Sequence, residues 1–234
     1  MCTVTIVPHR EGFRLVCNRD ELDTRPASTA PERHEIPPRV ATYPTDPLSG
    51  GTWIGVNDKG LAMTILNRTD TAGAERLAPR SRGLIVPSLL GHDLARAAVA
   101  AAGGLDPAAY EPFHLVVTDG TGAGLVSSDG GETSTHWFSL DRPLLFTSSG
   151  LGDALVEGPR RRLFEQMVLE AEDSWLDGQS RFHRHRWPDR PELSVWMKRA
   201  GARTVSRSLI DVTPGGGIDF RHELFDSSGA DRTW

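Results

Sequence analysis

The sequence has little cysteine and no long apolar run. Two cysteines in 234 residues are too few for a disulfide framework, and neither belongs to a CxxC pair or a zinc-type Cys/His spacing. No segment approaches the roughly 20 apolar residues that cross a membrane, and residues 1–7 lack the basic and apolar regions of a secretory signal. We therefore expect a cytoplasmic protein with reduced thiols, no membrane span and no metal.

Excess positive charge and the motifs of common cofactors are also missing. The formal net charge of -5 predicts no long-range attraction to nucleic acid or to an anionic membrane. The chain has no GxGxxG after a predicted strand, no P-loop, no HExxH and no GxSxG. We therefore expect no cofactor, and a small molecule as the partner.

What is present describes an ordinary globular protein rich in turns. Hydrophobic residues make up 38% and charged residues 24%, with 24 glycines and 16 prolines. The length suits one layered domain with a substantial core, so we predict a single domain over residues 1–234.

The chain opens with a predicted hairpin. Residues 3–7 and 13–17 are β-rich, and the proline and glycine between them indicate a turn. Antiparallel pairing with residues 9–12 as the loop places Val7 opposite Arg14 and Cys2 opposite Arg19. Cys2 is therefore expected to lie beside Asn-Arg-Asp-Glu at 18–21.

Further elements are predicted along the chain. The prolines of residues 24–50 favour an extended surface loop, and residues 50–67 are expected to form a second hairpin. Helical patterns cover residues 82–103, with a break or a second helix start near Pro87, and residues 159–174 and 191–200. Further strands are predicted at 113–118, 124–128, 136–140, 144–147, 204–212 and 218–224. This order predicts an α+β fold in which antiparallel sheet packs against helices.

Cys2 becomes the N-terminal residue when Met1 is removed, which a small second residue favours. Its α-amine and thiol have ordinary pKa values near 8 and 8.5, so one residue supplies both a base and a nucleophile. Arg19 can stabilise a thiolate or an oxyanion, and Asp20 can hold the amine by hydrogen bonds. The alternative is that Cys2 has no chemical role and that Arg19 and Asp20 form a surface turn.

Several short segments recur in one known family. They are Met-Cys at 1–2, Asn-Arg-Asp-Glu at 18–21 with Arg-Pro at 25–26, Gly-Gly-Thr-Trp-Ile-Gly at 50–55, Leu-Asn-Arg at 66–68, Arg-Ser-Arg-Gly at 80–83 and Arg-Thr at 203–204. Together they resemble the NRDE family, also called the transport and Golgi organisation family. The resemblance implies a four-layer αββα sandwich, with two antiparallel sheets between helical layers, as in the N-terminal-nucleophile (Ntn) hydrolases.

Cys2, residues 18–20 and residues 55–61 resemble more distantly the penicillin V acylase and bile-salt hydrolase group. That resemblance implies that Cys2 attacks an amide with support from Arg19 and Asp20, and that Asn67 donates to the oxyanion. Where those hydrolases carry a second asparagine, this chain has Thr-Ser-Ser-Gly at 147–150, so Ser148 or a backbone amide is expected to donate. A further arginine is expected near the site, supplied by Arg161, Arg162 or Arg203.

Other side chains with reactive groups have simpler interpretations. His183 and His185 stand among arginines and form either a metal or anion patch or a solvated loop; the prolines that follow favour the loop. Cys17 is predicted to be buried and unreactive, and Trp53 to be a core or cleft-wall aromatic. Asp20 and Glu21 are neighbours in a strand, so they point to opposite faces, which disfavours joint action at one centre.

Two functions remain open. The first is an N-terminal cysteine hydrolase that cleaves a linear, non-peptide amide through an acyl-enzyme on Cys2. The second is a non-catalytic binding or carrier protein on the same fold, for a haem or lipid-like ligand and with a role in trafficking, as the family resemblance implies. The missing second asparagine favours the carrier.

Overall fold

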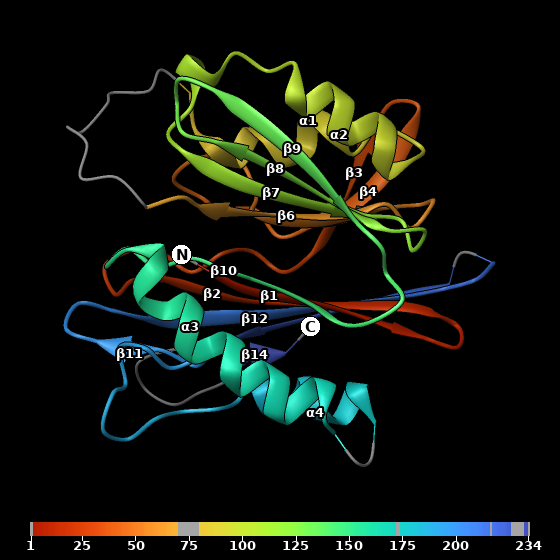
Figure 1. Ribbon diagram of the computed structural model, residues 1–234. Coiled ribbons are helices and arrows are strands. Elements are labelled where there is room, and N and C mark those ends of the chain that lie inside the picture. Colours follow the sequence, from red (N-terminus) through yellow and green to blue (C-terminus); the bar gives the residue numbers. More distant parts are fainter. Residues whose placement is uncertain (1, 70–79, 172–173, 216, 226–231, 234) are drawn as a thin grey trace.

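Two antiparallel β-sheets stack face to face, with helices on both outer surfaces, in the computed structural model of the chain (Figure 1). The structure describes residues 2–69, 80–171, 174–215, 217–225 and 232–233. Within these segments, no helix is long and apolar enough to cross a membrane. The predicted αββα sandwich is confirmed.

The first sheet is built around the predicted N-terminal hairpin. β1 (Cys2–His9) and β2 (Gly12–Leu22) pair antiparallel, and the register puts Val7 opposite Arg14 and Cys2 opposite Arg19, as predicted. The spatial order is β10-β1-β2-β12-β13-β14, with β11 also paired to β12. The other strands are β10 (Leu144–Thr147), β11 (Lys198–Arg199), β12 (Ala202–Thr213), β13 (Gly217–Leu224) and β14 (Arg232–Thr233). β1 therefore has a paired strand on each side.

The second sheet follows the order of the chain, β3 to β9. Its strands are β3 (Glu32–Ile36), β4 (Arg39–Tyr43), β5 (Ile54–Asn57), β6 (Ala62–Asn67), β7 (Phe113–Thr118), β8 (Ala123–Ser128) and β9 (Thr133–Phe138). The hairpin predicted at 50–67 is confirmed, and the strand expected at 136–140 begins three residues earlier. The extended loop predicted at 24–50 is wrong in part, because β3 and β4 form a hairpin there. Pro37 and Pro38 lie in its turn, where no ladder N–H is needed.

The helices cover the two outer faces (Figure 1). α1 (Ile85–Leu89) and α2 (Ala95–Gly103) pack on the second sheet, and α3 (Asp153–Phe164) and α4 (Trp175–Phe182) on the first. Short turns complete the set: η1 (Arg82–Leu84), η2 (Pro107–Ala109) and the π-helical η3 (Glu165–Leu169). Gly124 lets α2 approach closely, since a Cβ there would lie 2.3 Å from Val99 Cγ2.

Two helix predictions need correction, and a third is confirmed. A helix, α1, does start near Pro87, at Ile85, and Pro87 falls in its first turn, where its missing N–H costs no bond. The helix expected at 159–174 begins at Asp153, and α4 begins after Ser174, whose hydroxyl accepts from the Asp177 amide. No helix forms over 191–200, because carbonyls in this segment accept hydrogen bonds from a side chain of α3 instead.

Candidate functional site

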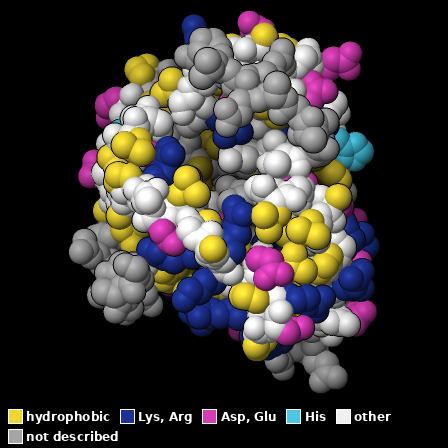
Figure 2. All heavy atoms as spheres, turned by 90° about the vertical axis from the view of Figure 1, so that its left-hand side faces the viewer, with side chains coloured by type: hydrophobic (Ala, Val, Ile, Leu, Met, Phe, Trp, Pro, Cys, Tyr) yellow, Lys and Arg dark blue, Asp and Glu magenta, His cyan; other side chains and the backbone are white. Residues whose placement is uncertain are grey.

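Cys2 lies at one end of the contact between the two sheets, where a cavity of about 130 Å³ opens. Its walls come from β1, β2 and β6, from the loop before β5 and from the turn at 81–83. Figure 2 shows Lys and Arg side chains gathered around a hollow in the face at this end of the molecule. The cavity therefore combines a buried thiol with positive charge.

Ser148 holds the main chain of Cys2 in place. The Cys2 nitrogen donates to Ser148 Oγ at 3.2 Å, and the Ser148 nitrogen donates to the Cys2 carbonyl at 3.0 Å. Ser148 is fully buried. Once Met1 is removed, the Cys2 nitrogen is the α-amine, which is the candidate base. The Ser148 hydroxyl is therefore hydrogen-bonded to that base. The sequence had suggested an oxyanion donor here.

Cys17 is the main influence on the Cys2 thiol. A hydrogen bond from Cys17 lowers the pKa of the Cys2 thiol below its ordinary value; burial opposes this effect, and the charge of Arg19 adds to it. The same contact, together with burial, raises the pKa of Cys17 well above its ordinary value. Cys17 is buried, as predicted, and Thr64 Oγ1 donates to its Sγ at 3.7 Å. The pair therefore favours a thiolate on Cys2 and a thiol on Cys17.

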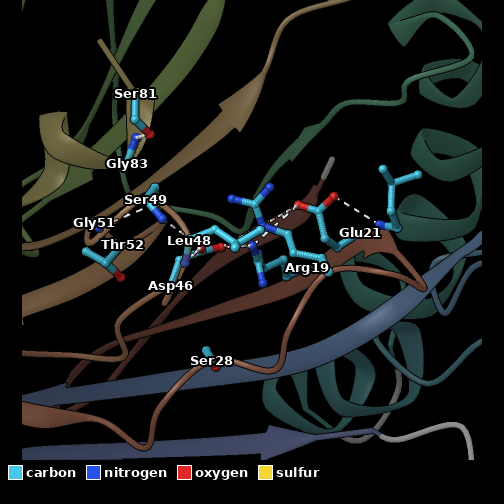
Figure 3. A network of polar contacts seen from close by, with 12 residues as sticks. Arg19, Glu21, Ser28, Asp46, Leu48, Ser49, Gly51, Thr52, Ser81 and Gly83 are labelled. Atoms are coloured by element: carbon cyan, nitrogen blue, oxygen red, sulfur yellow. Dashed lines mark hydrogen bonds and ion pairs between the residues drawn. The ribbon is translucent and has the colours of Figure 1, made fainter.

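Arg19 is fixed by two carboxylates and an aromatic ring. Its Nη2 donates to Asp46 Oδ2 at 2.6 Å and to Glu21 Oε2 at 3.4 Å, as Figure 3 shows. The guanidinium lies 4.3 Å from the centre of the Trp53 ring. Arg25 Nε donates to the same Asp46 oxygen at 2.8 Å. Trp53 is therefore the cavity-wall aromatic that the sequence predicts.

The Asp46 carboxylate stays ionised in spite of its burial. Burial raises the pKa of Asp46, but the Arg25 hydrogen bond and the charge of Arg19 outweigh that effect, and the pKa lies below its ordinary value. Asp46 also accepts from the Leu48 and Ser49 amides. It therefore ties the loop before β5 to the arginines of the site.

Asp20 lies on the opposite face of β2 from Arg19 and Glu21, as the strand alternation predicts. Its Oδ1 accepts from Thr204 Oγ1 at 2.6 Å. Burial raises the pKa of Asp20 above its ordinary value, and the charge of Arg160 opposes that rise.

Arg160 is the buried arginine that the sequence analysis missed. It is 1% exposed, and its Nη1 donates to Thr3 Oγ1 at 2.8 Å and to Thr147 Oγ1 at 2.9 Å. Its other nitrogens donate to the carbonyls of Leu193 and Ser194. Arg160 follows the buried Val156 by four residues, so both lie on the same face of α3. A helix predicted from Asp153 onward would have placed Arg160 on the buried face. Arg160 joins α3 to the strands beside Cys2.

The structure does not bring the three expected arginines into the Cys2 cavity. Arg161 and Arg162 are exposed on α3, and Arg161 pairs with Glu157 at 2.8 Å. Arg203 pairs with Asp23 at 3.0 Å and lines a neighbouring cavity on the other side of Arg19. Arg25 and Arg82 line the Cys2 cavity instead, together with Asn67 at the end of β6. Arg25 and Arg82 both belong to the family motifs quoted above, and this membership could have identified them as site residues from the sequence.

His183 is not in a solvated loop. It caps the C-terminus of α4, is 1% exposed, and hydrogen-bonds to Thr5 at 2.7 Å and to Asn18 at 3.0 Å. Burial lowers its pKa well below the ordinary value. The prediction failed because α4 was not foreseen. Among the described residues, no group of three or more His, Cys, Asp or Glu could hold a metal.

Stacked antiparallel sheets between helices, with a cysteine opening the first strand, define the Ntn-hydrolase fold class. The chain is similar to a Caenorhabditis elegans N-acylethanolamine-hydrolysing acid amidase orthologue (TM-score 0.62, 16% identity, 92% of this chain and 93% of that one). It is also similar to penicillin V acylase from Agrobacterium tumefaciens (TM-score 0.53, 11% identity, 100% of this chain and 90% of that one). A mutant conjugated bile acid hydrolase from Clostridium perfringens matches as well (TM-score 0.53, 12% identity, 100% of this chain and 96% of that one).

The family follows from the sequence itself. The chain belongs to the Transport and Golgi organisation 2 family, whose model matches residues 1–170. No curated protein sequence matches it. The resemblance stated from the motifs is therefore confirmed, both for the family and for the fold.

Proposed function

We propose that this protein is an N-terminal cysteine hydrolase that cleaves a linear, non-peptide amide. The observation that carries the proposal is the environment of Cys2 at the cavity. Its nitrogen is bound to Ser148, and Cys17 lowers the pKa of its thiol. The proposal requires that Met1 is removed, so that the Cys2 nitrogen is a free amine.

In this mechanism the Cys2 thiolate attacks the amide carbonyl and a tetrahedral intermediate forms. The Cys2 amine, which has taken the proton of the thiol, passes it to the departing amine nitrogen, the C–N bond breaks, and a thioester remains on Cys2. Water, activated by the same amine, then attacks the thioester and releases the acid. Asn67, which lines the cavity, is the proposed oxyanion donor.

The side chains around Cys2 have supporting roles in this proposal. Arg19 lowers the pKa of the thiol, and Asp46 and Glu21 keep its guanidinium in one position. Asp20 and Arg160 stabilise the ends of β1 and β2 from the other face. The similar solved structures are named as an amidase, an acylase and a hydrolase, which supports amide chemistry on this fold.

Intact-mass spectrometry tests the proposal. We expect wild-type protein to lack Met1 and to gain one acyl group from a panel of p-nitroanilides and β-lactams. Cys2→Ala should gain none, whereas Cys17→Ala, which removes the other thiol, should still be acylated at Cys2. A processed Cys2 that no member of the panel acylates would contradict the proposal.

A second cavity favours the alternative of a carrier protein. It measures about 520 Å³, lies between the second sheet, β10 and α3, and shares no lining residue with the Cys2 cavity. Many of its walls are apolar, as Leu66, Leu125, Phe138, Phe146 and Phe164 illustrate. The carrier proposal predicts saturable uptake of a fluorescent fatty acid, or of haem with a Soret band, that is unaffected by Cys2→Ala.

A further inference from the structure

Arg82 is held at the wall of the Cys2 cavity by backbone contacts. It opens η1, where the Gly83 amide donates to Ser81 Oγ at 3.2 Å. The Thr52 amide donates to the Gly83 carbonyl at 2.9 Å. A Cβ on Gly51 would lie 2.4 Å from that carbonyl carbon, so the two segments touch backbone to backbone. The position of Arg82 is therefore fixed by the fold.

The charges of this cavity do not balance. Three arginines line it, Arg19, Arg25 and Arg82, against two carboxylates, Glu21 and Asp46. Both carboxylates lie within 4 Å of Arg19 and of Arg25. Within the described segments Arg82 forms no ion pair, and its one hydrogen bond goes from Nη1 to the Pro112 carbonyl at 2.8 Å. Among the residues that the structure describes, the charge of Arg82 thus has no carboxylate within ion-pair distance.

Burial makes this imbalance matter. Partial burial lowers the pKa of Arg82, although the charges of Glu111, Glu21 and Cys2 oppose that effect. A desolvated charge is unfavourable until an opposite charge and hydrogen bonds compensate it. The planar guanidinium presents parallel N–H groups that match the two oxygens of a carboxylate.

The size of the cavity limits the group that it can take. A cavity of about 130 Å³ beside the thiol has room for a small polar group such as a carboxylate on a short linker. The apolar walls that would suit a long chain belong to the separate cavity beside α3.

We propose that Arg82 binds a carboxylate of the substrate in the Cys2 cavity, so that the preferred amides carry a carboxylate a few atoms from the scissile carbonyl. This inference rests on the proposed function, because it names the substrate class of the same site. Arg82 is then a specificity-determining residue that contacts the substrate and not the reacting atoms.

The first test compares two alkylating reagents that differ only in a carboxylate. Iodoacetate and iodoacetamide are each reacted with Cys2, followed by intact mass, and the rate ratio is divided by that of the neutral thiol N-acetylcysteinamide. We expect wild type to favour iodoacetate about tenfold over this reference, since a charge-assisted hydrogen bond is worth roughly 1.5–3 kcal/mol. Arg82→Gln should bring the ratio to the reference value.

Matched variants separate the role of Arg82 from general charge and from folding. Arg80→Gln removes the same charge from an exposed arginine of the same turn and should keep the wild-type ratio. Arg82→Lys should keep part of the preference, and thermal unfolding checks that each variant is folded. A ratio that Arg82→Gln leaves unchanged overturns the inference, as does an equal fall with Arg80→Gln.

Amide substrates distinguish failure of this inference from failure of the proposed function. Succinyl-p-nitroanilide and butyryl-p-nitroanilide have similar lengths, and only the first carries a carboxylate. Hydrolysis of both at equal rates, unaffected by Arg82→Gln, overturns the inference and leaves the hydrolase in place. Arg82-dependent alkylation without hydrolysis of any amide overturns the hydrolase and supports an anion-binding cavity. A Cys2 that neither alkylating reagent reaches overturns both.

Discussion

At the scale of single residues, the state of Cys2 depends most on another cysteine. The hydrogen bond from Cys17 lowers the pKa of the Cys2 thiol more than the charge of Arg19 does. Arg19 is also shared with Asp46 and Glu21, which weakens its effect on the thiol. In many reactive thiol sites a nearby cation lowers the pKa of the thiol. Here a neutral hydrogen-bond donor, buried between the two sheets, has the larger effect.

Replacing Cys17 tests this interpretation. Cys17→Ala removes the donor, so the pKa of Cys2 should rise and its alkylation by iodoacetamide should require higher pH. Cys17→Ser keeps a hydroxyl donor and should show a smaller change. The measurement is the rate of adduct formation on Cys2 against pH, by intact mass, and an unchanged midpoint in Cys17→Ala would contradict the assignment.

At the scale of elements, the first residue of α3 joins the two sheets beside the site. Asp153 Oδ1 accepts from the Ser149 amide at 2.7 Å, and Oδ2 accepts from the Thr69 amide at 3.1 Å. The Asp153 amide donates to the Thr69 carbonyl at 3.1 Å, and His114 lies 3.6 Å from Oδ2. The segments after β10 and β6, which carry the proposed site residues, are thereby fastened together.

Asp153→Ala should loosen both segments at once. Two amides lose their acceptor, so we expect a loss of about 1–3 kcal/mol in the free energy of unfolding, with a fall in the rate of Cys2 acylation. Asp153→Asn keeps one acceptor oxygen and should lose less. Urea unfolding measures the change; Glu157→Ala, on the exposed face of the same helix, is the control and should stay within about 0.5 kcal/mol. Equal losses for Asp153→Ala and this control would refute the role.

The hairpin at the N-terminus could be read from the sequence, whereas the buried arginine could not. Alternating β-rich segments and a short turn determine the pairing of Cys2 with Arg19, because strand register follows from counting. Arg160 depends on where α3 begins, and that start is set by Asp153 reaching a residue far away in the chain. Arg82 reaches the site through a contact between Thr52 and Gly83. Contacts of this kind leave no local pattern.

For the whole molecule, buried neutral histidines link distant parts of the fold. His222 on β13 hydrogen-bonds to Ser28 at 3.1 Å and to Ser208 at 2.9 Å. Burial, with a smaller effect of the Arg19 charge, lowers the pKa of His222 from 6.5 to about 4. His183 is neutral for the same reason. Burial therefore favours the neutral form of both histidines.

The protein should therefore lose stability in mild acid. Because the pKa of His222 is lower in the folded state, the unfolded chain takes up its proton first as the pH falls below 6.5. The contribution of His222 to stability is constant above that pH and declines towards pH 4. The part due to His222 is about 3 kcal/mol, at 1.36 kcal/mol for each pH unit between the two pKa values.

Urea unfolding at several pH values measures this decline. His222→Gln removes the titrating group, so its stability should fall less steeply between pH 6.5 and 4 than that of the wild type. The exposed His136→Gln should keep the wild-type slope. Equal slopes for all three proteins would show that His222 is not the group responsible.

The β1–β2 hairpin also makes the site sensitive to insertions and deletions at a distance. His9 lies seven positions along β1 from Cys2, about 23 Å at 3.3 Å per residue, and the turn closes at Gly12. Gly12 has a φ of 132°, and a Cβ there would lie 1.9 Å from the Val212 carbonyl oxygen, so this position of the turn has no room for a side chain. A codon gained or lost in this turn would shift the register by one and bring Asn18 or Asp20 opposite Cys2 in place of Arg19. Evolution is therefore constrained both in the length of this turn and in the glycine at position 12.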